Sequence, residues 1–341
     1  LAGYLRETAD AWNAAIERWT YVRGTELARQ QGVDGYYVRI SPSDPGSALP
    51  AEAWVPIKNR PAEQGYQPAS QVVSPDALAL VRFGLRAPDD PRILGTVKVI
   101  DALLKVELPA GPQWRRYNGD GYGEHADGSA FDGTGIGRPW PLLSAERAHY
   151  ELAAGRAGAA KALRDAMPSF ASQGCLLPEQ TWDAPDIARR ELVLGGPSGS
   201  AMPLAWAHAE YLKLCRSIAD GAVFDMPRQA VERYQVRRTG SKLTPWRFNL
   251  KARSLEAGQD LRIELLDPAR VRWTADAWRT QADVATRDTG LGVHCVDLPT
   301  AGLAPGARIE FTFYWTGAAR WEGADFSAEV SPPAPDAKAR P

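Results

Sequence analysis

Residues 137–170 read GRPWPLLSAERAHYELAAGRAGAAKALRDAMPSF, and this stretch shows how the first two thirds of the chain are organised. An irregular segment that carries Arg138 and Trp140 leads directly into two helical patterns, at about 144–154 and 157–170, with Gly155 between them. Antiparallel helices joined by so short a link form a helical hairpin. The stretch therefore predicts a hairpin of helices that follows a long, decorated loop.

The same arrangement recurs along the chain. Further helices are predicted at about 74–85, 93–104 and 200–219. Loops rich in Gly, Pro and aromatic residues separate them, at about 41–73, 109–142 and 174–198. Hairpins of this kind can close into a ring that collects the loops at one end. A stacked solenoid would need a fixed repeat of roughly 33 to 45 residues, and the sequence shows no such self-similarity.

The first residues already lie in a helical pattern. Leu5, Ala9, Trp12, Ile16 and Trp19 recur at steps of four and three, which predicts one apolar stripe on a helix. A domain rarely starts in the middle of a helix without a cap. We therefore expect an amino-terminal portion of the same protein to precede this chain.

From about residue 236 the apolar period changes from that of a helix to that of a strand. Ile309, Phe311, Phe313 and Trp315 give the clearest half-buried strand. We expect Trp273 and Trp315 to pack inward rather than to form a carbohydrate-binding face. The predicted organisation is a helical domain at 1–235, a small antiparallel β-sandwich at 236–330 and a disordered tail at 331–341.

The composition is that of an ordinary globular protein, with 341 residues, 37.1 kDa, 44% hydrophobic and 24% charged residues. Its 40 Lys and Arg against 41 Asp and Glu leave a formal net charge of -1, which argues against nucleic acid or an anionic membrane surface as a partner. No stretch reaches the roughly 18 apolar residues of a membrane span. The four His are too scattered to indicate a metal site, and no cofactor is expected.

Several short patterns resemble other sites but lack their partners. Glu146-x-x-His149 has the spacing of half a di-iron carboxylate site, and no second copy exists. His208-x-Glu210 lacks the Pro-Cys-x-x-Cys partner of the zinc deaminases. The Gly-rich segment 195–199 has no lysine with which to hold a phosphate. These patterns predict no site.

Four other segments combine aromatic, cationic and carboxylate side chains with flexible backbone. They are 114–123 with Arg116, Tyr117 and Asp120, 137–143 with Trp140, 177–183 with Glu179 and Trp182, and 199–206 with Trp206. Trp and Tyr cover the apolar faces of a sugar ring, while Arg, Asp, Glu and Asn form hydrogen bonds with its hydroxyl groups. Hydrolysis of a glycosidic bond also needs two carboxyl groups, one that donates a proton and one that accepts it. The segments therefore indicate a carbohydrate pocket.

In their order and separations these segments resemble the carboxy-terminal half of the catalytic domain of bacterial glucoamylases, glycoside hydrolase family 15. The resemblance runs from residue 1 to about 235 and continues into the β region. Glucodextranases and other α-glucosidases look similar in the same segments. Because the family's fold is an (α/α)6 barrel, the resemblance implies that this chain carries part of such a barrel, followed by the β-sandwich.

The resemblance also implies roles for particular residues. Family members invert the anomeric centre with two glutamates, and Glu179 occupies the position of the general base that activates the attacking water. Arg116 matches the arginine that binds hydroxyl groups of the non-reducing-end glucose, and Trp206 matches a tryptophan near the same subsite. The loop residues that should line the pocket are Tyr117, Asp120, Trp140 and Trp182.

The general-acid glutamate of the family has no match in this chain. In the family it lies upstream of the helix with which the chain begins, so the resemblance implies a missing amino-terminal portion that carries it. We expect the chain alone to be inactive, because the leaving oxygen would lack its proton donor. The implied substrate is an α-glucan or an oligosaccharide, and a periplasmic or secreted location fits the resemblance.

Three functional interpretations are open at this point. The first is an α-glucosidase that removes glucose from the non-reducing ends of α-1,4-linked glucans such as starch. The second is a noncatalytic carbohydrate-binding protein. The third is a related barrel enzyme, such as a glucodextranase that acts on α-1,6 linkages, a polysaccharide lyase or a phosphorylase. A phosphorylase would require inorganic phosphate, whereas a hydrolase would release sugar in plain buffer.

Overall fold

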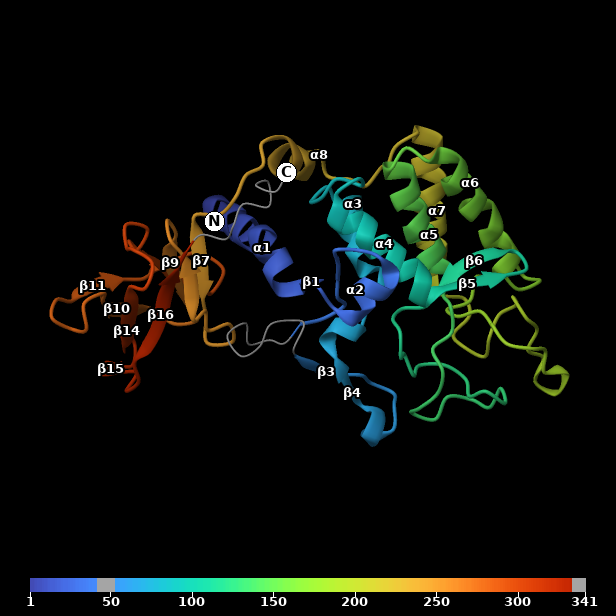
Figure 1. Ribbon diagram of the computed structural model, residues 1–341, viewed down its shortest axis with the longest axis horizontal. Helices are drawn as coiled ribbons and strands as arrows, with labels where there is room; N and C mark the ends of the chain where they lie inside the picture. The colour runs from blue at the N-terminus through green and yellow to red at the C-terminus, as the bar shows by residue number, and fades with distance from the viewer. Residues whose placement is uncertain (42–52, 333–341) are drawn as a thin grey trace. The chain divides into compact units, whose positions relative to one another are not determined.

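The computed structural model describes residues 1–41 and 53–332, and this part of the chain divides into two compact units (Figure 1). The helical unit holds the described residues between Thr20 and Arg238. The β unit holds those from Thr239 onward together with Leu1–Trp19. Most of the tail predicted at 331–341, and part of the loop predicted at 41–73, lie outside the described residues.

The helical unit is built from short and medium helices with three small strand pairs. Its α-helices are α2 (Glu26–Gln31), α3 (Ala79–Arg82), α4 (Pro91–Leu104), α5 (Pro141–Ala153), α6 (Ala157–Ala166), α7 (Ala205–Asp220) and α8 (Arg228–Ala230). Its antiparallel strand pairs are β1 (Tyr21–Arg23) with β2 (Gly35–Tyr37), β3 (Trp54–Pro56) with β4 (Tyr66–Pro68), and β5 (Lys105–Leu108) with β6 (Gly111–Trp114). None of the described helices is long and apolar enough to cross a membrane.

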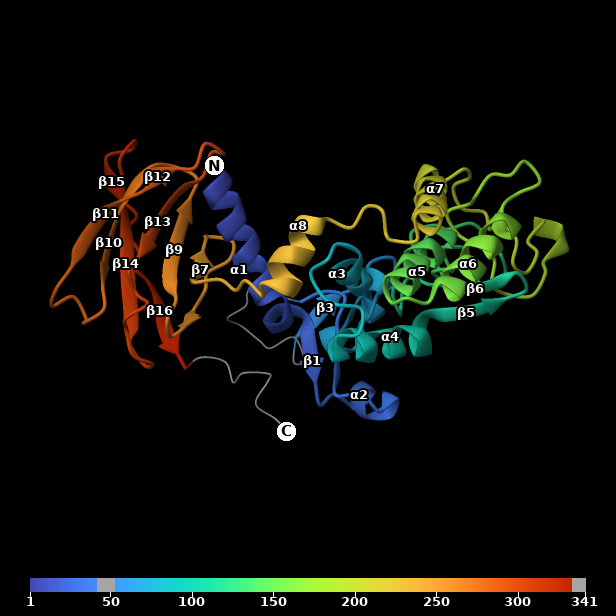
Figure 2. The same cartoon turned by 90° about the horizontal axis from the view of Figure 1, so that it is seen from above.

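Helix α5 is the central helix of this unit. It packs against both α6 and α7, and the three helices lie side by side in Figures 1 and 2. Pro141 occupies its first turn, where the missing backbone N–H needs no partner. Leu142, Ala145, Ala148 and Tyr150 are all buried, so the helix is covered on most of its sides. The hairpin of helices predicted from 137–170 is confirmed.

Two predicted helix starts lie in the wrong place. The helix predicted at about 74–85 does not begin at Ser74. The Ser74 hydroxyl donates to the Asp76 carboxylate at 2.8 Å, and the segment forms a 3-10 turn (Pro75–Leu78) before α3. The last helix starts at Ala205 rather than at 200. The preceding residues pair with the loop at 177–179 instead, because the Glu179 N–H donates to the carbonyl oxygen of Ala201 at 2.8 Å.

The β unit contains two sheets. Strands β11 (Ala282–Ala285), β10 (Ala269–Thr274), β14 (Arg308–Trp315), β16 (Phe326–Ser331) and β8 (Ser254–Glu256) form one sheet in this order, and β15 (Arg320–Trp321) pairs with β14. The other sheet runs β12 (Arg287–Asp288), β13 (His294–Leu298), β9 (Asp260–Leu265), β7 (Leu243–Trp246).

Most strand pairs of the β unit are antiparallel, as predicted, but β7 with β9 and β8 with β16 are parallel. The chain passes from β7 in one sheet to β8 in the other and back to β9 in the first. Two strands of one sheet that are joined through a strand of the other sheet can run in the same direction. The period of the apolar residues predicts strands but does not reveal this connection.

The core of the β unit is rich in aromatic residues. The ring of Trp246 lies 5.1 Å from that of Phe311 and 4.8 Å from that of Phe326, both in edge-to-face geometry. Trp273 and Trp315 pack against the same core, which confirms that they point inward. The aromatic residues of β14 thus stabilise the unit by burial.

Helix α1 (Ala2–Thr20) packs against the β unit on a face that the sequence did not predict. Leu5 and Trp12 of the predicted stripe are 51% and 47% exposed, whereas Tyr4, Ala11 and Ala15 are buried. The small alanine side chains let the helix approach the β unit closely. The Trp12 ring instead faces the Arg247 guanidinium at 5.7 Å.

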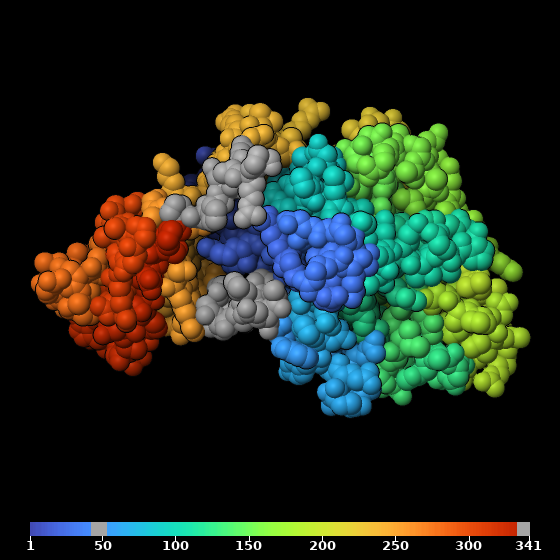
Figure 3. Space-filling view, in the orientation of Figure 1, coloured from blue at the N-terminus to red at the C-terminus, as the bar shows by residue number. Residues whose placement is uncertain are grey.

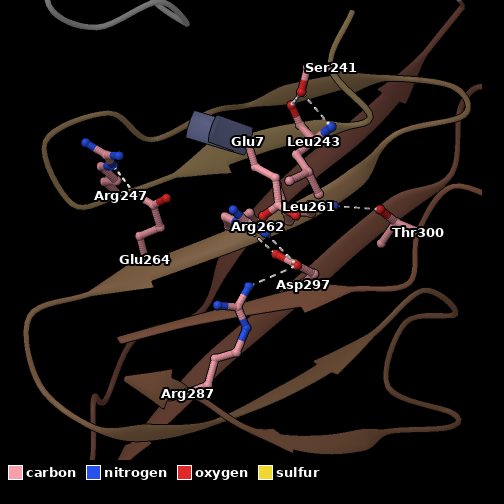
Figure 4. Close-up of polar contacts among 10 residues, drawn as sticks. All are labelled: Glu7, Ser241, Leu243, Arg247, Leu261, Arg262, Glu264, Arg287, Asp297 and Thr300. Carbon is pink, nitrogen blue, oxygen red and sulfur yellow. Dashed lines mark hydrogen bonds and ion pairs between the residues drawn. The ribbon is translucent and has the colours of Figure 1, made fainter. Parts of the chain in front are cut away.

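An arginine of the β unit holds helix α1 in place (Figure 4). Arg262 on β9 is only 2% exposed. Its Nη2 donates to Asp297 on the neighbouring strand β13 and to Glu7 of helix α1, both at 2.7 Å. A buried guanidinium needs such acceptors, because an unpaired buried charge is strongly destabilising.

Arg262 and Glu7 should therefore contribute very unequally to stability. We expect Arg262→Ala to lower the free energy of unfolding by about 2 to 4 kcal/mol, because it empties a buried site and removes the cation that Glu7 and Asp297 share, although Arg287 stays 3.6 Å from Asp297. Glu7→Gln should cost less than about 1 kcal/mol, because the side chain of Glu7 is half exposed. Urea unfolding followed by tryptophan fluorescence measures both values. Equal losses would contradict this assignment.

Candidate active site

Two long loops of the helical unit, at 115–139 and 171–204, lie next to each other and carry most of the predicted site residues (Figure 3). The Thr181 N–H donates to the carbonyl oxygen of Pro139 at 2.9 Å. The Gln180 side chain accepts a hydrogen bond from the Arg138 N–H at 2.9 Å, and the Gln180 N–H donates to the Ser200 hydroxyl at 2.9 Å. These bonds join segments that are far apart in the sequence.

Glu179 is half-buried, whereas the other residues of segment 177–182 are buried. Gln180 and Thr181 are 1% and 0% exposed, so the backbone on the carboxyl side of Glu179 is fixed. On its amino side, Leu177 is also buried, and its carbonyl oxygen accepts the N–H of Leu204 at 2.9 Å. The carboxylate is thus held by a rigid backbone while part of it stays accessible.

The surroundings of Glu179 favour a carboxyl group that accepts protons. Burial raises the pKa of the Glu179 carboxyl above its ordinary value, and this outweighs the opposite effects of Tyr122 and Arg116. The Tyr122 hydroxyl donates to Oε2 of Glu179 at 3.3 Å. A base is most effective when its pKa approaches the working pH, so the shift is in the useful direction.

Arg116 is held in a fixed orientation by Asp120. Its Nε and Nη2 donate to the two carboxylate oxygens of Asp120 at 2.8 and 3.0 Å, while the guanidinium lies 4.9 Å from the rings of both Tyr122 and Trp140. The Asp120 side chain is 1% exposed, whereas that of Arg116 is 34% exposed. The accessible group of this pair is therefore the guanidinium, and Asp120 positions it.

A glycine makes the Asp120 pocket possible. A Cβ atom at Gly137 would lie 2.6 Å from Cβ of Asp120, which is closer than real Cβ contacts allow. The Gly137 N–H also donates to the carbonyl oxygen of Asp120 at 2.8 Å. The close approach of the two backbones thus requires glycine at this position.

The other predicted residues differ in how much surface they offer. Trp206 is 54% exposed in the first turn of α7. Tyr117 is 6% exposed and lies under the Arg39 guanidinium at 4.1 Å. Trp182 is fully buried under the Arg138 guanidinium at 4.1 Å, and its Nε1 donates to the carbonyl oxygen of Pro185. A fully buried indole has no face for a sugar, so its position does not support the predicted binding role of Trp182.

Sequence reasoning missed two residues of this region, Tyr122 and Glu124. Tyr122 connects Glu179 to Arg116, and Glu124 lies in the same loop, 5% exposed. The available indication was the pair of glycines around Tyr122. A Cβ at Gly121 would lie 1.7 Å from the carbonyl oxygen of Asn59, and one at Gly123 would lie 2.2 Å from that of Ile136.

A second cluster of charged groups lines a cavity of about 290 Å3 together with Trp206. The Arg82 guanidinium donates to Glu210 and to Asp225, both at 2.7 Å. Glu146 lines the same cavity, where burial and the nearby Glu210 charge raise its pKa to about 7. Within residues 1–41 and 53–332, no three His, Cys, Asp or Glu side chains are grouped closely enough to hold a metal ion.

Comparison with known proteins identifies the family. The family model "Glycosyl hydrolases family 15" matches residues 2–216, so the chain belongs to glycoside hydrolase family 15. It is 40% identical over 230 residues to a glucoamylase of Clostridium sp. (strain G0005). This match covers 67% of this chain and 30% of that protein.

A solved structure supports the same assignment. The crystal structure of a bacterial glucoamylase complexed with acarbose matches with a TM-score of 0.59 and 40% identity, over 68% of this chain and 32% of that one. A wild-type glycosidase structure matches at 24% identity with a TM-score of 0.34, over 59% of this chain and 42% of that one, which is too weak to argue from. The chain has a glucoamylase-like fold with a helical part and a β-rich part, and it spans about a third of the length of these glucoamylases.

The charged cluster around Glu146 makes stability depend on pH. The folded protein keeps the Glu146 proton up to about pH 7, whereas the unfolded chain loses it near 4.5. The unfolded state therefore binds fewer protons between these values, and the free energy of unfolding falls as the pH rises, by up to about 3 kcal/mol. We expect Glu146→Gln to remove this fall and to raise stability above pH 7.

Melting temperatures measured from about pH 4 to pH 8 test this expectation. The matched control is Glu329→Gln, because Glu329 is an exposed residue of β16 in the other unit. An unchanged slope for Glu146→Gln, parallel to that of the control, would show that Glu146 titrates normally.

Proposed function

We propose that this chain contributes the general base and part of the sugar-binding surface of an inverting glycoside hydrolase that releases glucose from the non-reducing ends of α-glucans. The observation that carries the proposal is the position of Glu179 in a family 15 chain. Its backbone is fixed between buried neighbours, and its carboxylate accepts a hydrogen bond from the Tyr122 hydroxyl. Burial raises the pKa of this carboxyl group. A water molecule that gives up its proton to such a group becomes a nucleophile.

The substrate class is supported by the neighbouring groups. Arg116 offers a guanidinium held by Asp120, and the half-buried Tyr122 offers a ring beside it, whereas Trp140 is 5% exposed and packs against the guanidinium from within the protein. This combination suits a sugar, whose hydroxyl groups accept hydrogen bonds and whose C–H faces pack on aromatic rings. The glucoamylase relative and the acarbose complex favour an α-1,4-linked glucan over an α-1,6-linked one. Glucodextranase activity is the alternative within the same class.

The proposed architecture follows from the same assignment. We propose that the helical unit forms part of an (α/α)6 barrel and that the two sheets of the β unit form a sandwich. A two-glutamate mechanism also needs a proton donor, and we assign none among residues 1–341. Residues 1–341 expressed alone should therefore bind sugar without turning it over.

The role of Glu179 can be tested in the protein as its gene encodes it. We expect Glu179→Gln to lower kcat on maltose by about 1,000-fold, because the amide cannot accept the proton of the attacking water. Maltose binding, followed by tryptophan fluorescence, should persist. Glu329→Gln is the control and should behave like the unchanged protein. Turnover that persists in Glu179→Gln would contradict the proposal. A requirement for inorganic phosphate would favour a phosphorylase.

The hydrogen bond from Tyr122 should show in the pH profile. It lowers the pKa of Glu179, so its removal in Tyr122→Phe should raise that pKa further. A base with a higher pKa stays protonated to a higher pH, and the acidic limb of kcat/KM against pH should move toward higher pH. An unmoved limb would mean that this hydroxyl does not control the base.

A further inference from the structure

The β unit carries an exposed tryptophan to which no role has been assigned above. Trp321 lies on the two-residue strand β15 and is 40% exposed. Its cross-strand partner on β14 is Tyr314, whose ring meets the indole edge-on at 5.4 Å. Side chains alternate along a strand, so Tyr314 and Trp321 point away from Phe313 and the core of the unit. They belong to the outer face of the sheet that contains β14.

The indole of Trp321 lies over this sheet. The guanidinium of Arg272 on β10 is 4.7 Å from the indole ring. Arg272 is opposite Thr312, and β14 pairs with β10 as well as with β15, so the two side chains meet above β14. One side of the ring therefore rests on the sheet, while the other faces solvent. The C–H face of a sugar ring can pack on such a surface.

Hydrogen-bond donors lie beside the indole in fixed positions. Nε and Nη2 of Arg272 donate to the two carboxylate oxygens of Asp283 on β11, at 2.7 and 2.8 Å. The ion pair does not use Nη1, and the side chain of Arg272 is 31% exposed. The Arg270 guanidinium lies 5.4 Å from the Tyr314 ring on the same face. Guanidinium N–H groups beside an aromatic ring suit the hydroxyl groups around a sugar.

The outer face of the sheet favours a neutral ligand over a polyanion or a protein. Its charges on β10, β11, β14 and β16 balance, with three arginines and three carboxylates: Arg270, Arg272, Arg308, Asp283, Glu310 and Glu329. A polyanion would need an excess of cations. A stable protein interface covers about 800 Å2 on each partner. Among the described residues of these strands and β15, only Trp321 is a large apolar side chain that is exposed.

We propose that Trp321, Tyr314 and Arg272 form a binding site for a neutral polysaccharide, an α-glucan chain. The indole packs on the C–H face of a glucose unit, and Nη1 of Arg272 donates to its hydroxyl groups. The choice of an α-glucan rests on the proposed function, because an enzyme that acts on the ends of a glucan binds it more tightly through a second contact. The site itself needs neither Glu179 nor a proton donor.

β-Cyclodextrin tests this site, because a ring of α-1,4-linked glucose units has no non-reducing end for the Glu179 site to hold. In the protein as its gene encodes it, we expect Trp321→Ala to weaken β-cyclodextrin binding about 10-fold, the loss expected when an aromatic packing partner is removed. Trp321→Phe keeps a smaller ring and should weaken binding about 3-fold. Isothermal titration calorimetry measures these affinities. The kcat/KM for maltose should stay unchanged, because Trp321 takes no part in the proposed reaction.

Trp12→Ala is the matched control, because Trp12 is 47% exposed in the same unit and also lies near an arginine, Arg247, at 5.7 Å. It should leave β-cyclodextrin binding unchanged. Melting temperatures report whether each variant folds, and Trp321→Phe decides the site if Trp321→Ala does not fold.

The outcomes for the site and for the reaction are separate. The site is overturned if the unchanged protein does not bind β-cyclodextrin, or if the folded Trp321 variants bind it as tightly as the unchanged protein does. Tighter binding of cellohexaose, whose linkages are β-1,4, would contradict the choice of an α-glucan. If the unchanged protein does not cleave maltose, the proposed function fails, and the calorimetry still decides the site.

Discussion

Gln180 makes the contacts on which the arrangement of the candidate site depends. Its side-chain oxygen accepts the Arg138 N–H, its own N–H donates to Ser200, and its carbonyl oxygen accepts the Ser198 N–H at 3.0 Å. The two loops lack long helices or strand ladders of their own, so isolated backbone hydrogen bonds and single side chains satisfy their buried backbone groups. The orientation of Glu179 follows from this, because the residue is covalently bound to the one that joins the loops.

Buried carboxylates also fix the positions of arginine side chains in the same loops. Asp183 has a side chain that is 1% exposed, and it pairs with Arg138 at 2.8 Å and with the more exposed Arg115. Asp120 is buried to the same degree and holds Arg116. In both cases the acid is buried, while at least one guanidinium reaches toward solvent. Such pairs add little net stability, but they fix cations at the surface in a defined direction.

The sequence predicted the helices better than their ends or their environment. The 3.6-residue period identified α5 and α6, which pack against each other. The period failed for α1, where Ala11 and Ala15 rather than Leu5 and Trp12 face the β unit. The surface on which a helix packs, as well as the hydrophobicity of its side chains, determines which face of the helix is buried. The sequence did not predict the parallel strand pairs for a similar reason, because they depend on the path of the chain between the sheets.

The family motifs indicated Glu179 and Arg116 by their positions, but the sequence does not show how the surroundings of Glu179 differ from those of Glu124. Glu179 accepts a hydrogen bond from the Tyr122 hydroxyl and lies near the Arg116 guanidinium. Oε2 of Glu124 has no hydrogen-bond donor among the described residues. Their charges also repel, and Glu124 contributes to the raised pKa of Glu179. Burial and the Glu124 charge therefore raise the pKa of Glu179 together, whereas the hydrogen bond from Tyr122 and the Arg116 charge lower it.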